Sequence, residues 1–321
     1  MMMSSNIPEN VLVTGAAGFI GQVVVAELVK QGHHVKAMHR RPEQKELFTA
    51  EKNLETVVAD VNDAVSMEKA LQNIDVVIHL AGVVWGDASQ MRSSMVDGTI
   101  NLIEVMRKLK VKRLILASSI AVYDWGKLNG VLNEESPLLD KSDEGQSPYA
   151  LAKIQQECVA RDLCLSSGVG LTIFRLGAVF TSDRIETADL GPSVAGVQVV
   201  IAPLRKLRLV ALQDVALSFV EACSNRVSNN LTINLVDEVQ PSAWDFAKKV
   251  QGRKSSVKVV IPLPYVMLKA AAYPIYWMLK MLGIESKLPT LFLPKQIIGR
   301  FTSCRCDSSV WQKILPLIDR V

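Results

Sequence analysis

The feature that most constrains the fold of this chain is a glycine-rich turn between an apolar run and a helical run. Residues 11–14 form a short apolar run, and the turn that follows is Thr14-Gly-Ala-Ala-Gly-Phe-Ile-Gly21. In such a turn the first glycine permits a tight reversal and the second lets backbone amides approach a pyrophosphate. The third lets the helix pack closely on the strand. The turn therefore predicts a strand–turn–helix unit that binds a dinucleotide.

Further short apolar runs recur along the chain, and stretches of helical length separate the early ones. The runs lie at residues 35–39, 56–60, 75–80, 113–118, 171–176 and 231–236. They are nearly continuous rather than alternating, which is typical of parallel strands covered on both faces. Strand–helix alternation over residues 10–176 therefore predicts an α/β fold, a doubly wound parallel Rossmann sheet.

The rhythm of strands and helices changes after Arg175. Residues 177–210 look irregular, and residues 241–321 look mostly helical with several prolines. We therefore expect two parts, the second a smaller, discontinuous C-terminal substrate lobe. The expected boundaries are 8–176 with 211–236 for the Rossmann domain, and 177–210 with 237–321 for the lobe.

The amino-acid composition argues against some classes of binding partner. The chain has 36 basic and 32 acidic residues and no dense basic block, which argues against nucleic-acid binding. Five cysteines, odd in number and irregularly spaced, favour reduced thiols and a cytoplasmic protein, because the N-terminal sequence lacks the apolar stretch of a signal peptide. We interpret Cys304 and Cys306 as ordinary thiols and expect no metal site, since no further Cys/His cluster completes a zinc set.

The segment of residues 261–282 is the most membrane-like part of the chain. Three prolines and two lysines interrupt it, so we expect no transmembrane span. A core helix of the small lobe is the favoured interpretation. A peripheral membrane contact and the wall of an apolar substrate pocket are the alternatives.

Residues at the end of the second apolar run bear on the choice of cofactor. A carboxylate there would bind the adenosine ribose of NAD, but the chain has His39, Arg40 and Arg41, with no acid before Glu43. Guanidinium groups suit a 2′-phosphate, so NADP is favoured over NAD. A solvated basic loop is the alternative. Asp60, after the third run, could accept a hydrogen bond from the adenine amino group or cap a helix.

Four of the five tyrosines have a lysine four residues later. The pairs are Tyr123/Lys127, Tyr149/Lys153, Tyr265/Lys269 and Tyr276/Lys280. Gly126 interrupts the first pair, and the last two lie in the late apolar segment, where the side chains are expected to send polar tips to the surface. Tyr149 follows Ser147-Pro148, a good helix start, so its lysine falls on the same helical face. Such a lysine can lower the pKa of a tyrosine that acts as a base.

Six motifs in this order resemble the extended short-chain dehydrogenase/reductases, most closely their nucleotide-sugar epimerase/dehydratase and 3β-hydroxysteroid dehydrogenase-like branches. They are TGAAGFIG, ADVND, HLAG, SSIAVY, YALAK and FRLGAVF. The resemblance implies a catalytic set of Ser119, Tyr149 and Lys153, with Ser118 as the alternative to Ser119. The cofactor-binding residues that it implies are Gly15, Ala17, Gly18, Phe19, Ile20, Arg40, Asp60, Val61, Leu80, Ala81, Gly82, Ser118, Tyr149 and Lys153. The family also commonly forms homodimers.

One departure from the family pattern concerns proton transfer. Met95 stands where the family usually has an asparagine that helps hold a water in a proton relay, and a methionine cannot do this.

The substrate is suggested by two conflicting features. Arg205 and Arg208 could clamp a diphosphate, or could lie on a solvated strand edge. The apolar tail would suit a hydrophobic alcohol or ketone. We therefore expect an NAD(P)-dependent oxidoreductase acting on a secondary alcohol or ketone. A nucleotide-sugar epimerase/dehydratase with tightly bound NAD, and a non-catalytic dinucleotide-binding sensor or scaffold, are the alternatives.

Overall fold

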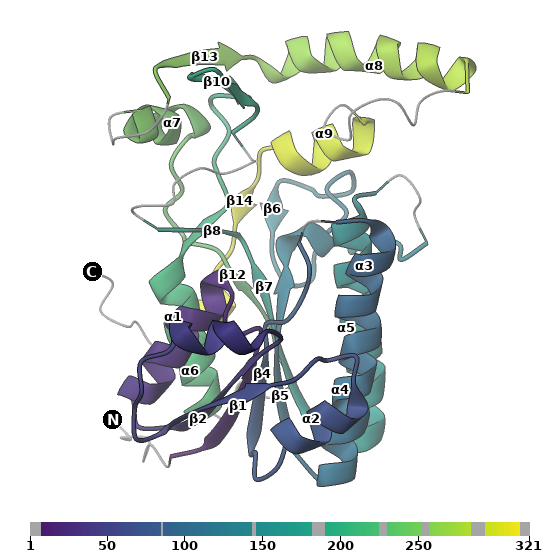
Figure 1. Ribbon diagram of the computed structural model, residues 1–321. Coiled ribbons are helices and arrows are strands. Elements are labelled where there is room, and N and C mark those ends of the chain that lie inside the picture. Colours follow the sequence, from purple (N-terminus) through teal and green to yellow (C-terminus); the bar gives the residue numbers. More distant parts are fainter. Residues whose placement is uncertain are drawn as a thin grey trace.

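The protein is described by a computed structural model covering residues 8–84, 86–142, 146–181, 190–224, 230–251, 257–283 and 293–314. Within these residues, seven parallel strands form a central sheet in the order β12-β7-β5-β4-β1-β2-β3 (Figure 1). The strands are β1 (Asn10–Thr14), β2 (His34–His39), β3 (Leu54–Val58), β4 (Val76–His79), β5 (Arg113–Ser119), β7 (Gly170–Leu176) and β12 (Thr232–Leu235). Every predicted apolar run forms one of these strands. The predicted doubly wound Rossmann sheet is confirmed.

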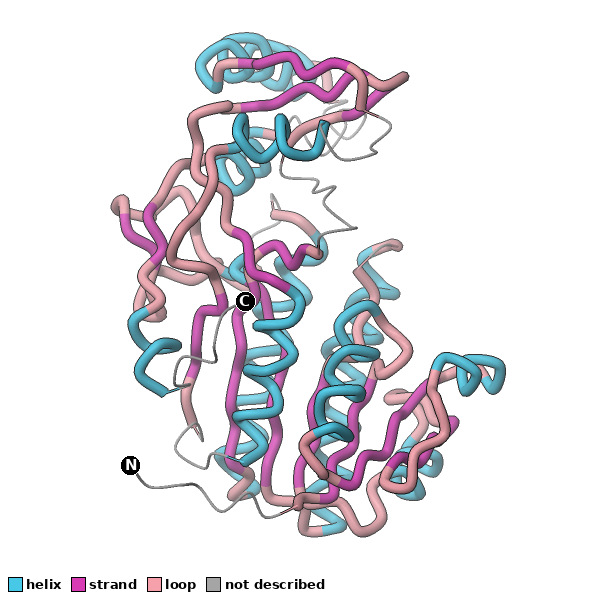
Figure 2. Tube along the Cα trace, turned by 90° about the vertical axis from the view of Figure 1, so that its left-hand side faces the viewer, coloured by secondary structure: helices cyan, strands magenta, loops and turns pink. Residues whose placement is uncertain are grey.

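Helices cover both faces of this sheet. Helices α1 (Phe19–Lys30) and α6 (Leu212–Ser224) pack on one face, while α2 (Ala64–Ala70), α4 (Gly98–Leu109) and α5 (Pro148–Ser167) pack on the other. Strand β1 shows why the runs are continuous: Val11 and Val13 belong to the first layer, and Leu12 to the second. Figure 2 shows the sheet between the helical layers. The sheet order reverses at β1 and β4, and the carboxyl ends of strands at such a point form a ligand crevice.

The smaller lobe lies beyond the carboxyl ends of the strands (Figure 1). It contains β9 (Ser193–Val194), β10 (Val197–Ile201), β13 (Val259–Leu263), α7 (Ala243–Gln251), α8 (Tyr265–Met281) and α9 (Pro294–Phe301). Two short pairs link lobe and sheet: β8 (Ala178–Phe180) with β11 (Leu209–Ala211), and β6 (Val131–Leu132) with β14 (Arg305–Cys306). The remaining α-helices of the described residues are α3 (Ala88–Arg92) and α10 (Ser309–Ile314).

The expectation that residues 177–210 are irregular is wrong for their described part. This segment supplies β8, β9, β10 and β11. The strands are short, and β10 pairs with β13 some sixty positions later in the chain. Their stability comes from partners that no local pattern reveals.

The division of the chain into a Rossmann domain and a lobe stays a proposal. Helix α10, near the chain end, lies in the range expected for the lobe. Trp311 of α10 packs in the core between α6 and the sheet, and its Nε1 donates to Ser218 Oγ at 3.0 Å. Residues around α10 therefore pack on the Rossmann sheet rather than on the lobe. Residues 315–321 of the expected lobe lie outside the described part of the chain.

The membrane-like segment forms β13 and α8. No helix among the described residues is long and apolar enough to cross a bilayer. The favoured interpretation of α8 as a core helix is wrong, because only Leu268 and Ala272 of this helix are buried.

Candidate active site

The glycine-rich turn borders a cavity of about 240 Å³ at the carboxyl ends of β1 to β4. Gly15 has a φ of +66°, and a Cβ there would stand 2.8 Å from the nitrogen of Ala81. A Cβ on Gly21 would collide with the backbone of the same turn, so α1 can start close beneath β1 only with glycine at this position. Gly18 is the N-cap residue of α1. Since a helix N-terminus carries partial positive charge, this cradle fits a pyrophosphate.

Most of the expected cofactor residues line this cavity. They are Gly15, Ala17, Gly18, Arg40, Asp60, Val61, Leu80, Ala81 and Gly82. Phe19 and Ile20 are the first residues of α1 instead. The lining also includes Ala59 and Asn62 of the ADVND motif, and residues outside the six motifs, namely Met38, His39, Gln44, Val83 and Ser94. Met38 and His39 end strand β2, and this position at a strand end is the signal that could have identified them.

The helix-capping alternative for Asp60 is wrong. The N-cap residue of α2 is Asp63, whose carboxylate accepts from the nitrogen of Val65. Asp60 Oδ1 accepts from the nitrogen of Asn62 at 2.9 Å, which fixes the loop beside the cavity. Its carboxylate is thus held at the end of β3, where the adenine role was expected.

A second cavity, of about 410 Å³, lies between the sheet and the lobe. Its walls include Ser119 from β5, Tyr149 from α5 and Arg208. Helix α5 starts with Ser147 as N-cap residue and Pro148 in its first turn, as expected, although the Ser147 side chain makes no capping bond. This start places Tyr149 at the carboxyl edge of the sheet, next to the end of β5.

Ser119 and Tyr149 are in direct contact. Their side chains are hydrogen-bonded, and Ser119 Oγ also accepts from the nitrogen of Ala121 at 3.1 Å. Burial raises the pKa of Tyr149, and the bond with Ser119 opposes this rise. Because Ser119 Oγ already accepts from a backbone amide, its proton is available to the Tyr149 oxygen. Burial outweighs this bond, so the pKa of Tyr149 stays above its ordinary value, and Ser119 limits the rise.

Lys153 lies one helical turn after Tyr149 and is buried. Its Nζ donates to the carbonyl of Ala117 at 2.8 Å and to Gln156 Oε1 at 3.0 Å. Burial lowers the pKa of Lys153 to about 8, against the opposing effect of the Glu157 carboxylate. The lysine is therefore mainly protonated at pH 7 and loses its charge as the pH rises through about 8.

A buried chain of hydrogen bonds runs from Lys153 toward the glycine-rich turn. Gln156 Nε2 donates to Thr99 Oγ1 at 2.9 Å, and His79 contacts Thr99 through Nε2 at 3.0 Å and Thr14 through Nδ1 at 2.7 Å. The Thr99 hydroxyl donates to the carbonyl of Met95, so the proton between Thr99 and His79 belongs to His79 Nε2. A neutral ring with its proton on Nε2 satisfies both contacts. Burial, helped by the charge of Lys153, lowers the pKa of His79 to about 3.

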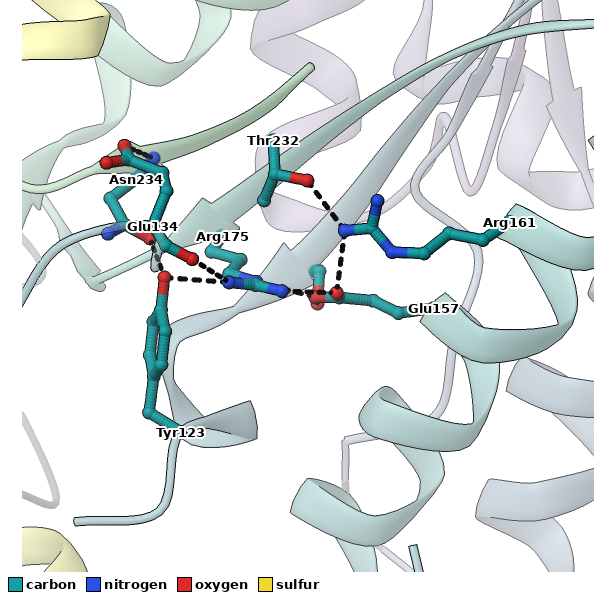
Figure 3. A network of polar contacts seen from close by, with 8 residues as sticks. Tyr123, Glu134, Glu157, Arg161, Arg175, Thr232 and Asn234 are labelled. Carbon is teal, nitrogen blue, oxygen red and sulfur yellow. Dashed lines mark hydrogen bonds and ion pairs between the residues drawn. The ribbon is translucent and has the colours of Figure 1, made fainter. Parts of the chain in front are cut away.

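Ser118 belongs to a different polar cluster, of which Figure 3 labels Tyr123, Glu157, Arg175 and Asn234. Its hydroxyl donates to Glu157 Oε1 at 2.6 Å, and Glu157 Oε2 accepts from Arg175 Nη2 at 2.8 Å. Arg175 Nη1 donates to the Tyr123 hydroxyl, which donates to Asn234 Oδ1. Burial alone would raise the pKa of Glu157, but Arg175 outweighs it and holds the pKa below its usual value. The Ser118 side chain is thus turned away from Tyr149 and toward this buried ion pair.

Arg205 and Arg208 do not lie on a solvated edge, since both are buried. Arg208 lines the second cavity, donates to the carbonyls of Gly299 and Arg300, and stacks 4.0 Å above the Trp125 ring. Arg205 lies over the ring of Phe301. The structure therefore brings Arg208, but not Arg205, to the wall that holds Tyr149.

Met95 is fully buried and packs with Met91, Ala152 and Tyr149. A Cβ on Gly82 would meet its side chain at 3.3 Å. The position of the family's asparagine is thus filled by an apolar side chain, between the two cavities.

A third cavity, of about 850 Å³, lies at the amino ends of β5 and β7, beside Arg113 and Gly170. Ligands of doubly wound sheets bind at the carboxyl ends, so the two smaller cavities are the better candidates.

The model of the NAD dependent epimerase/dehydratase family matches residues 11–191. A bifunctional UDP-glucose 4-epimerase and UDP-xylose 4-epimerase of Arabidopsis thaliana is 32% identical over 181 residues, 50% of this chain and 49% of that protein. Cinnamoyl-CoA reductase 1 of Oryza sativa subsp. japonica is 36% identical over 190 residues, 53% of this chain and 56% of that protein. The chain spans about half the length of the curated relatives that it matches.

Solved structures share the fold over nearly the whole chain. UDP-glucuronic acid 4-epimerase from Bacillus cereus, in complex with UDP-glucuronic acid and NAD, aligns with a TM-score of 0.69 and 20% identity. The alignment covers 97% of this chain and 94% of that one. MoeE5 in complex with UDP-glucuronic acid and NAD aligns with a TM-score of 0.70, the same coverage and 20% identity.

Proposed function

Because the chain belongs to the NAD-dependent epimerase/dehydratase family, whose members are NAD-dependent enzymes, we propose that it is an oxidoreductase. In this proposal it interconverts a secondary alcohol and a ketone in the second cavity. The observation that carries the proposal is the hydrogen bond between Ser119 and Tyr149 at the wall of that cavity, one turn from a buried lysine.

The proposed proton chemistry uses this chain's own residues. The Tyr149 oxygen takes the proton of the substrate hydroxyl in oxidation and returns it in reduction, while Ser119 polarises the substrate oxygen. The Lys153 ammonium, fixed by the Ala117 carbonyl and Gln156, favours the phenolate form of Tyr149. When bound, the nicotinamide accepts or supplies the hydride.

The first cavity is the proposed cofactor site. Gly15, Gly18 and the start of α1 would hold the pyrophosphate, and Asp60 would accept from the adenine. Arg40 is exposed at the rim of the cavity and can pair with a 2′-phosphate, which supports NADP over NAD. Met95 excludes the usual asparagine-held water, so we propose that protons leave through Lys153 and the cofactor ribose.

A nucleotide-sugar epimerase with tightly held NAD is the second candidate. The described lining of the second cavity contains Arg208, Lys295 and Arg300 and no acidic side chain. Such a lining would suit a diphosphate, and the epimerases among the relatives are consistent with it. A non-catalytic dinucleotide sensor is the third candidate, and Met95 is the feature that favours it.

Cofactor turnover distinguishes these candidates. The purified full chain is incubated with NADPH or NADH and a series of ketones, and with the oxidised cofactors and secondary alcohols, while absorbance of the reduced nicotinamide is followed. A net change that matches product formation supports the oxidoreductase. Product without net change in the cofactor supports the epimerase, and dinucleotide binding without any product over both substrate classes supports the sensor.

The cofactor preference is tested at Arg40. We expect Arg40→Ser to weaken NADP binding about tenfold, the loss of one charge-assisted contact, and to leave NAD binding nearly unchanged. Arg107→Ser, on the exposed surface of α4, is the control. Equal losses for both cofactors would contradict the NADP assignment. The cytoplasmic location and the homodimer stay predictions.

A further inference from the structure

Helix α8 presents an apolar face to solvent. Successive residues of an α-helix are turned by about 100°, so positions on one side of α8 follow from the sequence. Leu268 and Ala272 point inward and pack against Ile297 and Phe301 of α9. About a third of the circumference, on the opposite side, is apolar and exposed. Its large side chains are Val266, Met267, Trp277, Met278 and Met281, with exposed fractions from 55% to 87%. We call these five residues the apolar face of α8.

Such a face is unusual on a free surface. Singly exposed apolar residues are normal, but a contiguous patch marks a site of interaction. Figure 1 shows α8 as an outermost element, lying across the end of the molecule away from the central sheet. A flat partner can therefore reach the face along the length of the helix.

Charge identifies the partner. Residues 257–283 contain three lysines, Lys258, Lys269 and Lys280, and no acidic residue. Lys269 and Lys280 stand at one border of the apolar face. Lys269 lies 5.2 Å from the Tyr265 ring, and Lys280 lies 5.0 Å from the Trp277 ring. Lysines beside an apolar face, together with aromatic rings, are the pattern of helices that lie in the interface of a bilayer.

We propose that the apolar face of α8 docks the enzyme on an anionic lipid surface. The apolar side chains enter the headgroup region, and the bordering lysines remain at the level of the phosphates. A second copy of the chain fits less well, because a two-fold contact between two such helices would bring lysines together with no acid on the segment to pair them. The exposed Val259 and Ile261 of β13 lie at the same end of the molecule and extend the apolar surface.

Co-sedimentation of the full chain with vesicles tests this proposal. Vesicles of phosphatidylcholine and phosphatidylserine are compared with vesicles of phosphatidylcholine alone. Each lysine near an anionic surface contributes about fivefold in affinity, so three lysines predict roughly 100-fold tighter binding to the anionic vesicles, weakening with salt. Lys269→Gln/Lys280→Gln is expected to remove most of this preference.

The apolar contribution is tested by Met278→Glu/Met281→Glu, which should abolish sedimentation with either vesicle. The matched control is Leu165→Glu, which adds a charge at a similarly exposed apolar residue of α5. Unchanged thermal unfolding of each variant shows that folding is intact. Absence of binding by the unaltered chain, or equal binding by Met278→Glu/Met281→Glu, would overturn the proposal. So would a dimer in sedimentation velocity that this variant dissociates without any vesicle binding, since a second copy would then cover the face.

Discussion

Tyr123 and Tyr149 lie in two polar clusters that share helix α5. The two clusters differ in whether the tyrosine hydroxyl is enclosed by protein groups or lies at the wall of a cavity. The Tyr123 hydroxyl is enclosed, with Arg175 donating to it and Asn234 accepting from it. The Tyr149 hydroxyl bonds with Ser119 at the wall of a cavity. Both tyrosines have a lysine four residues later. We call Ser118, Tyr123, Glu157, Arg175 and Asn234 the closed cluster, and Ser119, Tyr149 and Lys153 the open cluster. A cluster whose hydroxyl groups are enclosed and paired stabilises a fold, whereas a hydroxyl at a cavity wall can act on a ligand.

The two clusters are joined through one turn of α5. Lys153 belongs to the open cluster and Glu157 to the closed one, and the Glu157 carboxylate opposes the fall in the pKa of Lys153. If the comparison is right, substitutions in the closed cluster change stability, and those in the open cluster change turnover.

The largest effect is expected at Glu157. Glu157→Gln leaves the buried Arg175 without its carboxylate, and breaking a buried pair in this way costs about 3–5 kcal/mol of unfolding free energy. Chemical denaturation measures this loss. The control is Glu68→Gln, which removes an exposed pair with Lys108 and should cost less than about 1 kcal/mol. Similar small losses for both variants would show that the closed cluster is not a stabilising one.

Tyr149→Phe is expected to act on turnover. The rate should fall at least ~10²-fold, the scale of general acid–base assistance, while dinucleotide binding and thermal unfolding persist. Steady-state kinetics and titration of the cofactor measure the two properties. Tyr276→Phe, which removes another hydroxyl with a lysine four residues later, should leave turnover unchanged. Full activity of Tyr149→Phe would refute the assignment of the open cluster.

His79 connects the open cluster to the glycine-rich turn. Because its ring is buried and neutral, the stability of the protein should fall at acidic pH. The folded pKa of about 3 lies below the ordinary value of 6.5, so the unfolded chain binds the proton first as the pH falls. Stability is therefore lost as the pH falls from 6.5 toward 3, by about 2 kcal/mol at pH 5. In His79→Gln this part of the loss should be absent. Denaturation at pH 7 and at pH 5 would then show a smaller difference in unfolding free energy than for the unaltered chain. An unchanged difference between the two pH values would rule out a neutral buried His79.

The smallest effect is expected at Tyr123. Tyr123→Phe removes two buried hydrogen bonds of the closed cluster and should cost about 1–2 kcal/mol of unfolding free energy, with turnover little changed. Denaturation and kinetics on the same preparation measure both. A loss of turnover comparable to that of Tyr149→Phe would erase the difference between the two tyrosines.

The sequence by itself determined the central sheet. Each strand is a continuous apolar run because both of its faces are buried, so the pattern is local and visible, as Val11, Leu12 and Val13 illustrate. The glycine-rich turn was equally visible, because Gly15 and Gly21 are required by backbone geometry within one short segment. Lining residues such as Gly18 and Arg40 followed from their place after a strand.

Only the tertiary structure decided the polar environments. Glu157 meets Arg175, and Gln156 meets Thr99 and through it His79, across separations in sequence that no motif encodes. The same holds for β10 and β13, and for the apolar face of α8, which the sequence left open between core and surface. The physical reason is that burial and hydrogen-bond partners are properties of contacts between distant segments. Strand propensity and glycine conformation, by contrast, are properties of neighbouring residues.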